Sequence, residues 1–78
     1  MTETKKKEAV AYVRSDIAML SEQTKESERQ AYHNRAQASS NAIYVGGLIT
    51  REELFKLGDE IGAANEKACR QVLAAQNK

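Results

Sequence analysis

The sequence contains no proline and a single cysteine, Cys69. One cysteine excludes a disulfide within the chain. His33 and Cys69 are the only nitrogen and sulfur candidates for a metal and lie far apart in sequence, so we expect no metal and no cofactor. Twelve Lys and Arg stand against eleven Asp and Glu, which leaves no overall electrostatic attraction to nucleic acid.

Long apolar runs are missing as well. The first ten residues, MTETKKKEAV, lack the hydrophobic centre of a secretory signal. The longest nearly apolar run, 42–49, is far shorter than the roughly 20 residues that cross a bilayer. With a lone cysteine, this pattern favours a cytoplasmic protein without a membrane partner.

Large apolar side chains are scarce. The hydrophobic share is 41%, but 12 of these residues are alanine and only 13 are Val, Ile or Leu. A short chain with so thin a core usually gains stability from disulfides, a metal or self-association. Since the first two are excluded, we expect a homo-oligomer, most simply a dimer.

The first half of the chain predicts one helix over about residues 4–39. Nothing in that range breaks a helix, and Val10, Val13, Ile17 and Leu20 repeat at helical spacing. The stretch 21–30 has no apolar side chain, so an alternative places a break near 24–27, where Ser27 and Gln30 have the spacing of a capping box. We favour the continuous helix.

The residues around Gly46-Gly47 predict a linker over 40–49. Only glycine adopts positive φ without penalty, which makes this pair the strongest break signal in the chain. Ile43-Tyr44-Val45 favours extended geometry, so a short strand over 42–45, paired with another chain, remains an alternative.

A second helix is predicted over 50–76. Thr50 and Glu53 have the spacing of a capping box, and Ile49 and Leu54 that of a hydrophobic staple. The apolar stripe of this helix comprises Leu54, Leu57, Ile61, Ala64, Ala68, Val72 and Ala75.

These elements predict a single all-α domain over 1–78, an antiparallel two-helix hairpin that completes a helical bundle by homo-oligomerisation. The predicted oligomer core consists of Val10, Val13, Ile17, Leu20, Leu54, Leu57, Ile61 and Val72.

Gly58 and Gly62 are unexpected inside a helix, because each costs about 1 kcal/mol relative to alanine. We favour close approach of another helix; a break at Gly62 or a ligand at the backbone are alternatives. The two glycines also have the spacing of a helix-turn-helix. That interpretation assigns nucleic-acid contacts to Asn65, Lys67, Arg70 and Gln71.

Catalytic residues do not assemble in the sequence. His33 and Cys69 lack the partners of a nucleophilic site, so we expect no enzyme. We expect a helical protein–protein interaction or regulatory module with an unidentified protein partner, of the kind found among phage and plasmid accessory regulators. The alternative is a nucleic-acid-binding regulator. In size and layout the predicted hairpin resembles small plasmid copy-number regulators, which implies RNA binding by a dimeric helical hairpin.

Overall fold

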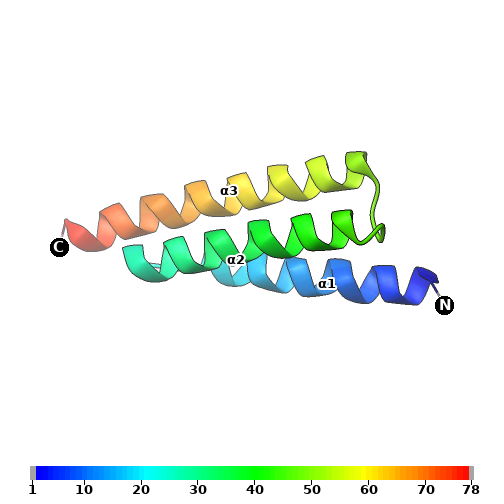
Figure 1. The fold of residues 1–78 in the computed structure, drawn as a ribbon. Helices are drawn as coiled ribbons and strands as arrows, with labels where there is room; N and C mark the ends of the chain where they lie inside the picture. Colours follow the sequence, from blue (N-terminus) through cyan, green and yellow to red (C-terminus); the bar gives the residue numbers. More distant parts are fainter. Residues whose placement is uncertain (1, 78) are drawn as a thin grey trace.

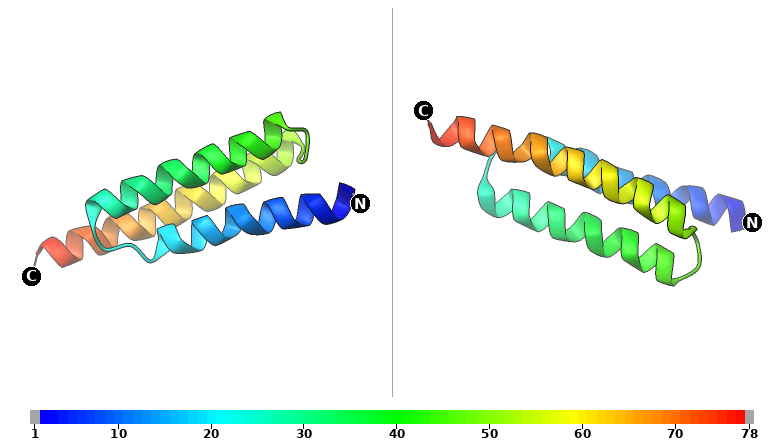
Figure 2. Two further views of the ribbon diagram at one scale, coloured as in Figure 1. Left: turned by 60° about the horizontal axis from the view of Figure 1, so that its bottom comes forward. Right: turned by 90° about the horizontal axis from the view of Figure 1, so that it is seen from above.

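The computed structural model describes residues 2–77, which form three helices and no strand (Figure 1). These are α1 (Thr2–Ser21), α2 (Glu26–Val45) and α3 (Arg51–Gln76). Helix α2 runs antiparallel to both neighbours, so the termini lie at opposite ends of a rod of 49 × 18 × 14 Å (Figure 2). The predicted all-α class is confirmed. The two-helix hairpin is wrong, and with it the resemblance in layout to hairpin regulators.

The third helix arises because the predicted continuous helix over 4–39 is interrupted between Ser21 and Glu26. The interruption lies close to the alternative break at 24–27. A helix continued through this polar stretch would bury no apolar surface. A turn instead lets the apolar stripe of α1 pack against α2 and α3, and all three helices contact one another.

Two glutamine side chains hold this turn. Gln23 is buried, and its Nε2 donates to the Met19 carbonyl at 2.7 Å. Gln71 reaches over from α3, and its Nε2 donates to the carbonyls of Ser21 and Gln23, both at 3.0 Å. Gln71 thereby satisfies the Ser21 carbonyl at the end of α1, and the other two bonds tie the turn to α1 and α3.

The Ser27–Gln30 capping box does not form. Helix α2 starts one residue before Ser27, with Lys25 as an N-cap in extended conformation whose side chain makes no capping hydrogen bond. Ser27 therefore lies within the first turn of α2, where it cannot act as the cap.

Helix α2 continues to Val45, so the predicted strand over 42–45 is wrong and the linker is shorter than 40–49. These residues stay helical despite their preference for extended geometry, because α2 ends directly after them in a favourable C-cap. Gly47 has φ +78° and its N–H donates to the Tyr44 carbonyl, while Leu48 N–H donates to the Ile43 carbonyl. This is a Schellman motif, which needs a left-handed residue at the position of Gly47.

The start of α3 confirms the predicted capping box. Thr50 Oγ1 accepts from the Glu53 N–H at 3.1 Å, and Glu53 Oε1 accepts from the Thr50 N–H at 2.9 Å. Ile49 is buried, and Leu54 packs against the same core cluster, as expected for a staple. The helix begins at Arg51 with Thr50 as its cap and ends at Gln76, close to the predicted bounds.

The core lies inside a single chain. Of the eight predicted oligomer-core residues, six are buried: Val13, Ile17, Leu20, Leu57, Ile61 and Val72. The other two, Val10 and Leu54, are partly buried against them. Their assignment to an oligomer interface is therefore corrected, because the third helix, which only the alternative break near 24–27 allowed for, covers the apolar surface that a partner chain was expected to cover. Whether the chain self-associates stays a prediction.

Candidate interaction surface

The helix-turn-helix geometry predicted around Gly58 and Gly62 is absent, because α3 continues through both glycines. The break proposed at Gly62 is wrong for the same reason. Two of the four predicted nucleic-acid residues make contacts inside the bundle. Asn65 Oδ1 accepts from Arg29 Nη1 at 2.6 Å, and Gln71 caps the α1 turn. Only Lys67 and Arg70 are exposed.

Gly58 and Gly62 are exposed, and nothing within residues 2–77 packs closely enough against them to require glycine. A Cβ atom built on either residue meets no atom within 4 Å. Neither glycine therefore serves close packing of helices within residues 2–77. The favoured prediction, close approach of another helix, stays a prediction for a helix of a different chain. The two residues leave a strip of helix backbone bare on the surface of the bundle.

That bare strip lies in a groove between α2 and α3 with a volume of about 560 Å³. The groove carries apolar and backbone surface together with a few polar side chains. From α2 it is lined by His33, Gln37, Ser40 and Asn41, and from α3 by Leu54, Phe55, Gly58, Asp59, Ile61 and Gly62.

The exposed side of α3 carries a line of apolar and small residues, which we call the outer stripe. It consists of Phe55, Gly58, Gly62, Cys69 and Leu73, which recur at spacings of 3, 4, 7 and 4 along the helix. Phe55 is 60% exposed and Leu73 is 59% exposed. The guanidinium of Arg51 lies 5.6 Å from the centroid of the Phe55 ring. The outer stripe therefore borders the groove and exposes two large apolar side chains.

Other exposed apolar side chains are more scattered. Tyr12 and Met19 are on α1, and Tyr44 and Val45 are at the end of α2. Tyr44 lies eleven residues after His33, about three helical turns, and therefore on the same face of α2. Scattered single residues of this kind are ordinary for a protein surface. Phe55 and Leu73 on the outer stripe are likewise far apart, with the exposed Glu66 on the same face between Gly62 and Cys69.

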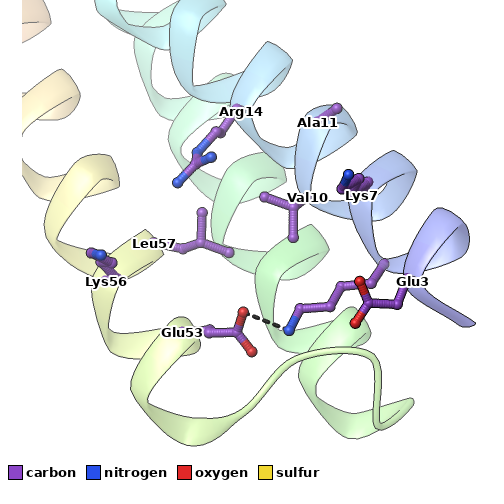
Figure 3. A pocket seen from close by; sticks show the side chains of 9 residues that line it. Glu3, Lys7, Val10, Ala11, Arg14, Glu53, Lys56 and Leu57 are labelled. Carbon is purple, nitrogen blue, oxygen red and sulfur yellow. Dashed lines mark ion pairs between the residues drawn. The ribbon is translucent and has the colours of Figure 1, made fainter.

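A second hollow of about 600 Å³ lies between α1 and α3, and its character is ionic (Figure 3). Lys6 Nζ pairs with Glu53 Oε2 at 2.8 Å. Nearby, Arg14 forms a two-pronged contact with Glu60, Nε to Oε1 at 3.2 Å and Nη2 to Oε2 at 3.1 Å. Four cationic side chains and two carboxylates line the hollow, and the Lys6–Glu53 pair ties α1 to α3.

Glu53 makes this ionic contact sensitive to pH. The Lys6 ammonium and the Thr50 N–H lower the pKa of Glu53 from 4.5 to about 2. A lowered folded-state pKa contributes stability above pH 4.5 that is lost as the pH falls toward 2. We therefore expect the stability advantage of the wild type over a Glu53→Gln variant to shrink across that window. Solvent exposure of both side chains keeps the effect small.

Urea unfolding of both proteins between about pH 2 and 7 measures this difference. The Gln variant retains the shape of the side chain but cannot titrate, which makes it the matched reference. Two stability curves that run parallel through the whole window would contradict the assignment.

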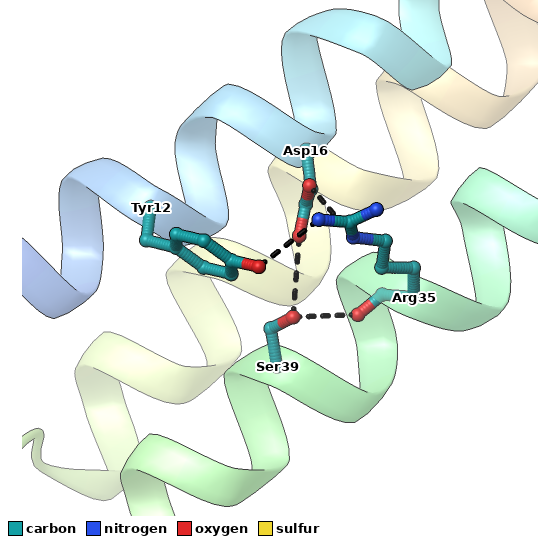
Figure 4. Close-up of polar contacts among 4 residues, drawn as sticks. All are labelled: Tyr12, Asp16, Arg35 and Ser39. Atoms are coloured by element: carbon teal, nitrogen blue, oxygen red, sulfur yellow. Dashed lines mark hydrogen bonds and ion pairs between the residues drawn. The ribbon is translucent and has the colours of Figure 1, made fainter.

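A buried carboxylate links α1 to α2 (Figure 4). The Asp16 side chain is only 7% exposed, and its Oδ1 lies 3.2 Å from Arg35 Nε. Its Oδ2 accepts from Ser39 Oγ at 3.3 Å, and Arg35 Nη2 donates to Tyr12 Oη at 3.0 Å. Arg35 itself is 54% exposed and reaches water. Because the Asp16 carboxylate is paired with the Arg35 guanidinium, this cluster orients α1 against α2. The paired carboxylate is not available as a general base.

The remaining chemistry-bearing residues are isolated. His33 is half-buried on α2 with its Nε2 3.3 Å from Gln37 Nε2, and Cys69 is half-buried on α3. Within residues 2–77 no group of three or more His, Cys, Asp or Glu side chains is placed to hold a metal ion. No helix in the same range is long and apolar enough to cross a membrane.

The two unusual glycines could be identified from the sequence, but the groove in which they lie could not. The groove needs α2 beside α3, and that placement depends on the break at 22–25, which we did not favour. The spacing of Phe55 and Leu73 with the glycines was readable from the sequence, since eighteen residues make five turns of α-helix. Which face of α3 points outward became clear only with the third helix in place.

No family model, no curated protein and no solved structure matches this chain.

Proposed function

We propose that the chain is a small non-enzymatic interaction module that regulates another macromolecule. A helix of that partner binds in the α2–α3 groove. The observation that carries this proposal is the bare backbone at Gly58 and Gly62. Each glycine lowers helix stability by about 1 kcal/mol relative to alanine, and no contact within the chain compensates. A partner that approaches the backbone closely would account for both residues.

The surroundings of the glycines suit a helical partner. Amphipathic helices bind grooves through apolar residues at helical spacing, and polar groups at the rim fix their orientation. Here the exposed Phe55 and the partly buried Leu54 supply apolar surface in the groove. His33, Gln37 and Asp59 supply hydrogen-bonding groups along it.

Nucleic-acid binding is not favoured by this surface. Asp59 is the only carboxylate in the groove, and the groove contains no Lys or Arg side chain. Phosphate contacts require such cations, and they produce a steep loss of affinity with salt.

Filling the groove tests the proposal. We expect the double variant Gly58→Leu and Gly62→Leu to lose partners captured by the wild type from extracts of the native host, because leucine side chains would occupy the space above the backbone. Leucine is a strong helix former, so the variant should remain folded, which circular dichroism checks.

The matched control is Ala38→Leu, which adds a leucine at an exposed position of α2 that does not line the groove. Isotope-labelled bait distinguishes a captured second copy of the chain from another macromolecule. Capture that is the same for all three proteins would overturn the proposal.

A further inference from the structure

The hollow between α1 and α3 combines a cationic rim with an apolar floor (Figure 3). We propose that this hollow binds a small amphipathic anion, in which a carboxylate or a phosphate monoester ends a short hydrocarbon chain. The hollow shares no lining residue with the α2–α3 groove, so this proposal stands apart from the partner helix proposed there.

Most carboxylates around the hollow are already engaged within the chain. Glu53 accepts the backbone N–H of its capping box at one oxygen and pairs with the Lys6 ammonium at the other, at 2.8 Å. Glu60 uses both of its oxygens on Arg14. Among the residues that line the hollow, Glu3 is therefore the one carboxylate that forms no ion pair within residues 2–77.

The cations of the rim are less fully engaged. Lys7 on α1 and Lys56 on α3 line the hollow and form no ion pair within residues 2–77. Lys6 and Arg14 keep N–H donors that their ion pairs do not use, since an ammonium carries three donors and a guanidinium five. Against Glu3 alone, both helices thus offer donors that an oxyanion can accept.

The orientation of the two helices also favours an anion. Helices α1 and α3 both run antiparallel to α2, so their N-terminal ends lie at the same end of the bundle (Figure 2). The hollow is lined by positions 3–14 of α1 and 53–57 of α3, close to both N-terminal ends. The partial positive charge of a helix N-terminus stabilises a nearby anion. The C-terminal end of α2 lies at the same end of the bundle, but no residue of α2 lines the hollow.

The floor of the hollow indicates that the anion has an apolar part. Val10 and Leu57 point toward each other between Arg14 on one side and Glu53 on the other (Figure 3). Val10 is partly buried and the neighbouring Ala11 is exposed. A short hydrocarbon chain can lie on these two residues and on the methylene stems of the lysines. An inorganic anion would leave this apolar surface uncovered.

The size of the hollow suits a small ligand. Its volume of about 600 Å³ lies within the range of roughly 300 to 1,000 Å³ that is typical of small-molecule sites. Because the cations of the rim are largely exposed, each contact with the anion contributes little. We therefore expect a dissociation constant on the order of 1 mM.

An NMR titration of amide chemical shifts in the full chain tests the proposal. The probes are octyl phosphate and octanoate, each kept below the concentration at which it forms micelles. We expect saturable shifts centred on Val10, Ala11 and Leu57. Tighter binding of octyl phosphate would identify the ligand as a phosphate monoester, and tighter or equal binding of octanoate would identify it as a carboxylate.

Three smaller or oppositely charged probes separate the contributions. Ethyl phosphate and acetate keep the headgroup but lose the chain, so we expect each to bind at least about fivefold more weakly than its octyl counterpart. Octylammonium keeps the chain but reverses the charge, and it should cause no shifts at the hollow. Octylammonium shifts equal to those of octanoate would overturn the assignment of an anion site.

A pair of double variants tests which cations bind the headgroup. Lys7→Gln with Lys56→Gln should weaken binding of the octyl anions roughly fivefold, because both unpaired ammonium groups of the rim are lost. The matched control is Lys5→Gln with Lys67→Gln, which removes the same charge from exposed positions of α1 and α3 that do not line the hollow. At about 0.15 M salt, screening should keep its affinity within about twofold of the wild type.

Three results would overturn the proposal. One is the absence of shifts with both octyl anions up to about 10 mM, well above the expected dissociation constant. Another is a set of shifts that spreads over lysines on the whole surface without a centre at the hollow. The third is an equal loss of affinity in the two double variants, because this result would mean that the anions respond only to the net charge of the chain.

Discussion

Replacing Leu57 by alanine is expected to lower the free energy of unfolding by roughly 3 kcal/mol, within the range of about 2 to 5 kcal/mol seen for buried leucines. Leu57 is 2% exposed and lies in the core that all three helices share. The loss combines the lost burial of the side chain with a cavity that the surrounding helices cannot fill. Urea unfolding of the variant and the wild type at one protein concentration measures it.

Leu73→Ala is the matched control, since it makes the same chemical change in the same helix. Leu73 is 59% exposed, so we expect a change of no more than about 0.5 kcal/mol at a concentration where the chain is monomeric. Equal losses for the two variants would mean that α3 does not face the core as described.

The double substitution Gly58→Ala and Gly62→Ala is expected to raise the free energy of unfolding by roughly 2 kcal/mol. Each alanine removes about 1 kcal/mol of helix penalty, and its Cβ meets no atom within 4 Å. A stabilising effect of this size from two substitutions is uncommon, because most single changes destabilise a protein. Thermal and urea unfolding both report it.

Gly47→Ala is the control with the opposite sign. Gly47 has φ +78°, where a side chain is strained, so we expect a loss of about 1 kcal/mol or more. If alanine at 58 and 62 destabilised the isolated chain, the glycines would serve its own folding. A partner at the groove would then have no support.

These two predictions concern different faces of α3, one in the core and one at the groove. The face with Leu57 stabilises the chain. The face with the glycines lowers the free energy of unfolding, and no contact among residues 2–77 offsets that loss. Binding surfaces often contain residues that lower the stability of the free protein. Substitutions that raise stability at such a surface therefore often reduce function. We accordingly expect the alanine pair to weaken binding of a partner in the α2–α3 groove while it stabilises the free chain.

Local signals in the sequence predicted the second half of the fold well. Thr50 and Glu53 lie three residues apart before an apolar run, and the hydrogen bonds of a capping box follow from that spacing alone. The stripe of Leu57, Ile61 and Val72 was likewise assigned correctly as buried. Such features depend on interactions within one helix and on which of its faces is apolar.

The first half depended on contacts that no local pattern contains. The turn at 22–25 is held by Gln71, nearly fifty residues away, and its carbonyls accept that side chain only once α3 is in place. Propensity alone favoured a continuous helix, because nothing in the polar stretch breaks one. The same error converted an intrachain core into a predicted oligomer interface and hid the groove beside α2.

The extended preference of Ile43-Tyr44-Val45 was overridden for a related reason. The glycine pair after these residues completes a C-cap, so the helix stays intact up to Val45. The break signal was correct, but its effect begins after Val45 and leaves the preceding residues helical.

Three helices of one chain enclose a complete core, so the fold should not depend on self-association. Sedimentation equilibrium combined with circular dichroism at roughly 1 µM tests this directly, because mass action dissociates a weak dimer at that concentration. We expect a monomer of 8.7 kDa with the same helical signal as at a clearly higher concentration. A helical signal that disappears on dilution together with the dimer would contradict an intrachain core.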